Sequence, residues 1–138
     1  MSSRFARPRL LVVALVTAAL AIPALALAAG GNSVAIEAPH KAKVEKHLTF
    51  RVKGTVSSPS DLGVFVNPKG VKCKTTYATE FGVGSGYGKH GVQGSFNEKF
   101  GFSRFPQSGT YYLCAYIFSP AIPPQNLAMA SSKVVVKH

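Results

Sequence analysis

Only five of the chain's 138 residues are acidic, two are cysteines and none is tryptophan. The acids form no paired or clustered motif of the kind that glycoside hydrolases or metal sites use. The four histidines lack the H-x-x-x-H spacing of zinc sites, and no serine lies in a G-x-S-x-G motif. These absences predict a protein that is not an enzyme, with no catalytic residue, no metal and no cofactor.

The N-terminal segment is basic at its start and then free of charge. Three arginines and no acid precede residue 10: Arg4, Arg7 and Arg9. Residues 10–29 form an uncharged, mostly apolar run, in which Pro23 precedes two overlapping small-x-small sites that end at Ala26 and Ala28. This order of features is typical of a secretory signal peptide. We predict a signal peptide over residues 1–28, cleaved after Ala26 or Ala28, and one secreted domain over residues 29–138.

An uncleaved signal anchor is the alternative, because about 20 apolar residues suffice to span a bilayer. Residues 29–138 contain no second run of that kind. We therefore expect contact with a membrane only through the N-terminal segment, if it is retained. In either case the domain is expected to be extracellular or associated with the cell envelope.

The two cysteines, Cys73 and Cys114, are expected to form one disulfide. Disulfides persist in the oxidising environment that export supplies, and neither cysteine lies in a C-x-x-C pair or near a histidine in the sequence. Closing a loop of this length stabilises a domain by about 4 kcal/mol in the chain-entropy model. That is a large share of the stability of so small a domain.

Residues 29–138 show the two-residue period of β-strands. The clearest case is 47–56, where Leu48, Phe50, Val52 and Val56 share one face. Gly109–Phe118 is apolar on both faces, as expected of a central strand. We predict seven strands in all: 33–38, 47–56, 62–66, 71–77, 96–102, 109–118 and 127–137. Their number and spacing predict an all-β fold, an antiparallel β-sandwich.

The segments between these strands are rich in turn-forming residues. Asn67–Gly70 predicts a β-turn with Asn at the first position, Pro at the second and Gly at the fourth. Residues 75–81 fit a turn of helix as well as the end of a strand. Six of the thirteen glycines fall within 82–94, which predicts a mobile loop or the tip of a hairpin. The prolines of Ser119–Asn126 predict a second loop.

The sequence Gly109-Thr110-Tyr111-Tyr112-Leu113-Cys114 resembles strand F of immunoglobulin-like domains, where a tyrosine stands two residues before a half-cystine. The resemblance implies an immunoglobulin-like β-sandwich in which the hydroxyl of Tyr112 bonds to nearby backbone. Two departures separate the chain from antibody-type domains: Cys73 follows the third predicted strand instead of lying on the second, and tryptophan is absent. The whole chain is also similar to uncharacterised small exported proteins of high-GC Gram-positive bacteria.

The predicted mature domain is strongly basic. Without the three arginines of the signal peptide, thirteen basic residues remain against five acids, a net charge of +8. The candidates for an anion-binding surface are Lys41, Lys43, Lys46, Arg51, Lys53, Lys69, Lys72 and Lys74. The positive electrostatic field of such a domain attracts anionic partners, here envelope polymers or another protein. Nucleic acid is not expected as a partner, because the core needs most of the aromatic residues that would stack on bases. The alternative is that the lysines keep the protein soluble and protect exposed strand edges.

These features predict a secreted, non-catalytic binding or envelope-associated module that attaches to anionic wall polymers through its lysines. The two predicted loops are the expected recognition elements, because loops on a rigid sandwich vary without loss of the core. Their candidate contact residues are Tyr87, Lys89, His90 and Phe118. The alternative function is a small-ligand carrier or secreted inhibitor with an apolar pocket near Phe100 and Tyr116.

Overall fold

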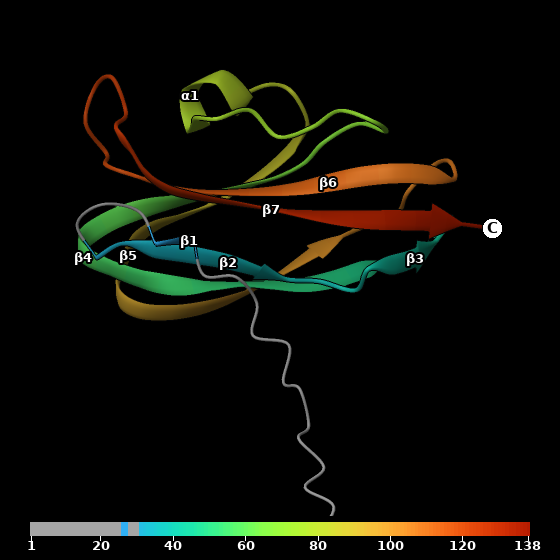
Figure 1. Cartoon of the computed structure of the whole chain (residues 1–138), viewed down its shortest axis with the longest axis horizontal. Helices are drawn as coiled ribbons and strands as arrows, with labels where there is room; N and C mark the ends of the chain where they lie inside the picture. Colours follow the sequence, from blue (N-terminus) through green and yellow to red (C-terminus); the bar gives the residue numbers. More distant parts are fainter. Residues whose placement is uncertain (1–25, 28–30) are drawn as a thin grey trace, which may run out of the picture.

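The computed structural model of the chain describes residues 26–27 and 31–138 and shows an all-β protein, as predicted. Seven strands and one short helix follow in the order β1 (Ala26–Leu27), β2 (Ser33–Glu37), β3 (Lys41–Lys43), β4 (Leu48–Val66), α1 (Tyr77–Glu80), β5 (Ser85–Phe102), β6 (Gly109–Phe118) and β7 (Asn126–Lys137). The predicted signal peptide lies outside the described residues apart from Ala26 and Leu27, which pair with β2. In Figure 1, β6 and β7 lie above β2, and α1 lies above β6.

The strands form one mixed sheet that curls on itself, in the order β1-β2-β4-β6-β7-β3 with β5 paired to β4. Every pair is antiparallel except β3 with β7, which are parallel. β4 belongs to both layers, since residues 51–55 pair with β2 and residues 61–66 pair with β6. The change lies around Ser60, where the register with β5 shifts twice. The fold is thus a curled half-barrel of mixed pairing instead of two separate antiparallel sheets.

The main core lies inside this curl. The predicted alternation in 47–56 is confirmed, since Leu48, Phe50, Val52 and Val56 are all buried. β6 lies between β4 and β7 with both faces largely buried, as predicted for a central strand. β4 and β6 together supply most of the apolar side chains that the curl encloses.

A second, smaller cluster lies on the outer face of β4 and β6. It consists of Phe65, Cys114, Tyr116 and Phe118. Residues 71–84, named here the strap, connect β4 to β5 and cross this face with α1 in their middle (Figure 1). This part of β4 and β6 is therefore buried on its outer side by the strap as well as on its inner side by the core.

The structure corrects three predictions between residues 47 and 77. The strands predicted over 47–56 and 62–66 are one strand, β4. The strand predicted over 71–77 is not formed, and the alternative, a helical turn, is α1, capped by Thr76. The turn predicted over Asn67–Gly70 is displaced by one residue, since the Val71 N–H donates to the Pro68 carbonyl (3.0 Å). Gly70, with a φ of 77°, takes the third position, where a positive φ favours glycine.

The mobile loop predicted over residues 82–94 is wrong, because β5 begins at Ser85 and runs through the glycines. Gly86 is paired with Phe65 of β4, and a Cβ at Gly86 would lie 2.9 Å from the Phe65 ring. This glycine therefore serves close packing between neighbouring strands. The second predicted loop is confirmed as far as Gln125, since β7 begins at Asn126.

The tyrosine hydrogen bond implied by the immunoglobulin resemblance is made by Tyr111 instead of Tyr112. The Tyr111 hydroxyl donates to the carbonyl oxygen of Gln107 (2.9 Å), and its ring is buried in the main core. Cys114 lies on the outer face of β6, so a tyrosine two residues earlier also points outward. Because the disulfide here lies outside the core, the tyrosine that faces inward is shifted by one position.

Candidate functional site

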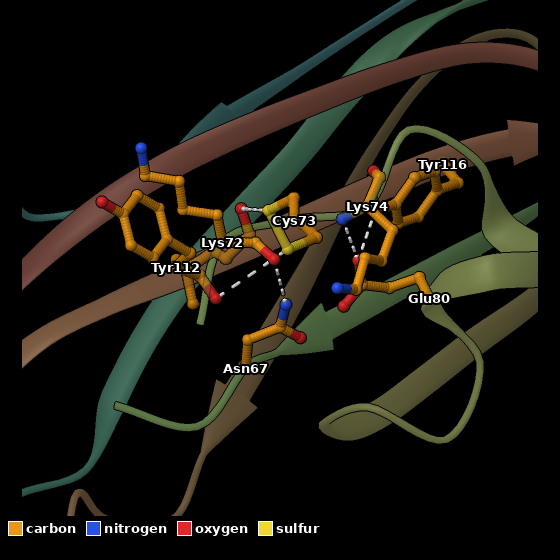
Figure 2. Close-up of a disulfide and its surroundings, with 9 residues drawn as sticks. Asn67, Lys72, Cys73, Lys74, Glu80, Tyr112 and Tyr116 are labelled. Atoms are coloured by element: carbon orange, nitrogen blue, oxygen red, sulfur yellow. Dashed lines mark hydrogen bonds between the residues drawn. A yellow bond between two sulfur atoms is a disulfide. The ribbon is translucent and has the colours of Figure 1, made fainter. Parts of the chain in front are cut away.

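The disulfide predicted between Cys73 and Cys114 is formed, with a Cα–Cα distance of 5.6 Å. Cys73 belongs to the strap and Cys114 to the middle of β6. Figure 2 shows the disulfide beside Lys72 and Lys74, the neighbours of Cys73 in the strap. The bond therefore attaches the strap to the outer face of the sheet. Its position beside the aromatic cluster makes it a structural tether.

A buried carboxylate fixes the other end of the strap. Glu80 of α1 is fully buried, and its Oε2 accepts from the backbone N–H of Lys74 (2.5 Å). The Tyr116 hydroxyl lies 2.7 Å from the same oxygen and 2.6 Å from the Lys74 carbonyl (Figure 2). Burial, together with the Glu80 carboxylate, raises the pKa of the Tyr116 phenol, so this group remains a donor.

Most basic side chains of residues 31–138 have no acidic partner. Three of the exposed or partly exposed carboxylates are already in ion pairs: Glu37 with Lys53, Glu45 with Arg104 (3.2 Å) and Glu98 with Lys89 (2.6 Å). Asp61 is hydrogen-bonded to His90 (3.1 Å). The fifth acid, Glu80, is buried beneath the strap. Ten of the thirteen lysines and arginines in this part of the chain therefore carry charge that no carboxylate offsets.

Four of these uncompensated lysines gather where β3 meets β7. The parallel register places Lys43 directly opposite Lys137 and Lys41 opposite Val135. Lys41, Lys133 and Lys137 line a shallow groove of about 640 Å³. We name the four exposed residues Lys41, Lys43, Lys133 and Lys137 the basic face.

The basic face continues toward the strap. Lys133 is the register partner of Tyr112 on β6. Lys72, which is exposed on the strap, lies near Tyr112, because Asn67 donates to the carbonyl oxygens of both residues (3.3 and 3.0 Å). The cationic surface thus extends from β3 across β7 to the segment that the disulfide holds.

The other predicted anion-binding residues lie apart from this face. Arg51 donates to the side chain of Asn97 (3.1 Å), and Lys53 is paired with Glu37 on β2. The remaining three, Lys46, Lys69 and Lys74, are exposed on separate connecting segments. Sequence analysis missed Lys133 and Lys137, since only the parallel pairing of β3 with the distant β7 brings them to Lys41 and Lys43.

A separate groove of about 270 Å³ lies on the outer face of β4 and β5. It is lined by all four residues predicted as recognition contacts: Tyr87, Lys89, His90 and Phe118. These residues belong to strands β5 and β6 and not to loops. The strap residues Tyr77 and Phe81, which sequence analysis did not select, complete its aromatic wall.

The apolar pocket predicted near Phe100 and Tyr116 is filled by the protein's own side chains. Phe100 stacks on Phe50 with ring centroids 5.8 Å apart, and Tyr116 is completely buried. Across residues 26–27 and 31–138, no three His, Cys, Asp or Glu side chains gather closely enough to hold a metal ion. In the same part of the chain no helix has the length and apolarity that crossing a membrane requires.

Comparison of the chain with models of known protein families and with curated proteins gives no match.

Proposed function

We propose that this protein is a secreted, non-catalytic module that attaches to anionic polymers of the cell envelope through the basic face. The observation that carries the proposal is the register of β3 and β7, which places Lys43 directly opposite Lys137. Like charges on directly opposite residues of neighbouring strands destabilise a sheet. Among the described residues neither lysine has a carboxylate partner. A bound polyanion supplies the missing counter-charge.

An extended polymer suits this surface better than a single small anion. The basic face is an open groove over two strands and continues toward Lys72 on the strap. A polymer that carries regularly spaced negative charges contacts several of these lysines at once. The positive field of the domain also raises the rate at which such a polymer is captured.

The proposal includes export. A disulfide is compatible with an extracellular protein, because such bonds persist in oxidising compartments. In this proposal the predicted signal peptide over residues 1–28 directs the chain to export. N-terminal sequencing of the protein from envelope and culture fractions is expected to find chains that begin after Ala26 or Ala28. Recovery of only the intact chain from the cytosol would contradict this.

We also propose an immunoglobulin-like arrangement, supported by the strand pairing. β2 pairs with the first half of β4, as strand A does with strand B. β7, β6 and the second half of β4 lie side by side, as strands G, F and C do. In this assignment β4 supplies both B and C, and the disulfide joins strand F to the strap instead of to strand B.

Two variants of equal charge test the attachment. The first replaces the basic face (Lys41, Lys43, Lys133 and Lys137) with glutamine. The control replaces four exposed lysines elsewhere: Lys46, Lys69, Lys74 and Lys99. Binding of each to long-chain polyphosphate and to isolated cell walls is measured at rising ionic strength.

We expect the basic-face variant to lose at least tenfold in affinity while the control stays close to wild type, and we expect salt to elute the wild type because exposed charges are screened. Equal losses in both variants would show that the charge acts diffusely. Retention on walls that does not change with salt would overturn the electrostatic mechanism.

A further inference from the structure

The groove on the outer face of β4 and β5 has a flat floor of glycines. Gly63 of β4 is paired with Gly88 of β5, and Gly86 follows on the same face. Gly86 and Gly88 are exposed and carry no side chains, so this stretch of β5 leaves its backbone accessible, whereas Gly63 is covered by the Tyr77 ring. A ring-shaped ligand can lie flat on such a floor.

The wall on the side of the strap is aromatic and preformed. Tyr77 stacks on Phe118 with ring centroids 3.7 Å apart. The Tyr77 ring lies so close over Gly63 that a Cβ there would be 2.6 Å away. Phe81 lies 6.1 Å from Tyr77 between centroids and is 70% exposed at the edge of the groove. Most of the Phe81 ring is therefore open to contact with a ligand.

The end of the groove is polar. Asp61 Oδ2 lies 3.1 Å from Nδ1 of His90, and its Oδ1 accepts from the Gly91 N–H (3.1 Å). Lys89, which also lines the groove, is paired with Glu98 (2.6 Å). This end of the groove therefore offers hydrogen-bond donors and acceptors. The His90 ring is 92% exposed, so it can turn toward a ligand without loss of packing.

We propose that this groove binds one neutral pyranose ring of a glycan. A pyranose has an apolar face of C–H groups, which fits the exposed ring of Phe81, and an edge of hydroxyls, which fits Asp61 and His90. The groove's 270 Å³ lies just below the range of about 300 to 1,000 Å³ that drug-sized ligands occupy, so it suits a single ring. This site is independent of the basic face.

The alternatives fit the groove less well. A wholly apolar ligand covers the Asp61 carboxylate without giving it a new hydrogen bond, which is unfavourable. An anion is opposed by Asp61, and an organic cation is opposed by the net charge of +8 on residues 29–138. A neutral polyhydroxyl ring meets none of these penalties.

The test is titration of the ¹⁵N-labelled, disulfide-bonded protein with methyl glycosides of glucose, mannose, galactose and N-acetylglucosamine, followed by amide NMR. We expect at least one glycoside to shift the amides of Gly86, Gly88 and Gly91, with a Kd on the order of 1 mM, since a single ring offers few contact atoms. Cyclohexanol and benzyltrimethylammonium serve as apolar and cationic probes. We expect both to bind more weakly than the best glycoside.

Phe81→Ala is expected to weaken glycoside binding at least fivefold. Ile122→Ala is the matched control, because Ile122 is also an exposed apolar side chain, 99% accessible, but does not line the groove. Polyphosphate binding by Phe81→Ala is expected to remain at the wild-type level, which separates this site from the basic face. No shift with any of the four glycosides, tighter binding of either probe, or equal effects of the two substitutions would overturn the proposal.

Discussion

The Tyr116 hydroxyl lies 2.7 Å from the carboxylate of Glu80, and neither side chain is accessible to solvent. The pair joins β6 to α1 and so fixes the strap at a second point beyond the disulfide. The strap in turn supplies Tyr77 and Phe81 to the aromatic groove. The stability of this contact therefore determines whether the groove keeps its shape.

Tyr116→Phe is expected to destabilise the protein by about 1–3 kcal/mol, because it removes a donor from a buried carboxylate that has few other partners. Urea unfolding followed by circular dichroism measures the change. Tyr112→Phe is the control on the same face of β6, because its ring is partly exposed, and we expect a change below about 0.5 kcal/mol. Equal effects of the two substitutions would contradict a special role for the Glu80 contact.

The free energy of unfolding is expected to fall at alkaline pH, because the pKa of the Tyr116 phenol differs between the folded and unfolded states. Burial, reinforced by Glu80, raises the pKa of this phenol in the folded state above its ordinary value near 10. Below about pH 10 the group is protonated in both states and the stabilisation is complete. At higher pH only the unfolded chain releases the proton, so the free energy of unfolding falls by about 1.4 kcal/mol per pH unit.

The difference between the wild type and Tyr116→Phe isolates this contribution from other titrating groups. Urea unfolding from about pH 9 to about pH 11 is expected to show the wild type losing its advantage as pH rises. If the free energies of unfolding of the two proteins changed in parallel over this pH range, the Tyr116 phenol would titrate alike in the folded and unfolded states.

The parts of the fold that sequence analysis predicted are those with a strong side-chain period. Leu48, Phe50 and Val52 alternate with polar residues, and the apolar Gly109–Phe118 is flanked by turn signals. Both patterns depend on local sequence alone, and both segments are strands with the expected burial. The disulfide was predictable for a different reason, because two cysteines in a chain predicted to be exported leave only one pairing.

The features that sequence analysis missed depend on contacts between residues that lie far apart in the sequence. The glycines of β5 carry no side-chain period, and Gly86 is explained only by the Phe65 ring on a neighbouring strand. Lys43 and Lys137 meet only because β3 and β7 run parallel. No local pattern in either segment indicates such pairings.

Loss of the disulfide is expected to cost about 2–5 kcal/mol. The double substitution Cys73→Ser with Cys114→Ser is compared with the wild type by urea unfolding, with and without reductant. Reductant is expected to lower the free energy of unfolding of the wild type to that of the double variant. It is expected to leave the free energy of unfolding of the double variant unchanged. Two reactive thiols in the denatured, unreduced wild type would contradict the bond itself.

Gly86→Ala and Gly88→Ala are expected to differ, although both positions lie in the floor of the groove. A Cβ at Gly86 meets the Phe65 ring at 2.9 Å, whereas a Cβ at Gly88 meets its nearest neighbour, the Leu62 carbonyl oxygen, at an ordinary 3.6 Å. Overpacking of this kind costs about 1–3 kcal/mol, so we expect Gly86→Ala to be destabilised by that amount. Gly88→Ala is expected to stay within about 0.5 kcal/mol of the wild type in thermal and urea unfolding, because surface changes without a clash usually do. If both variants unfolded alike, β5 would not lie against Phe65 in the register described, and the floor of the groove would have a different shape.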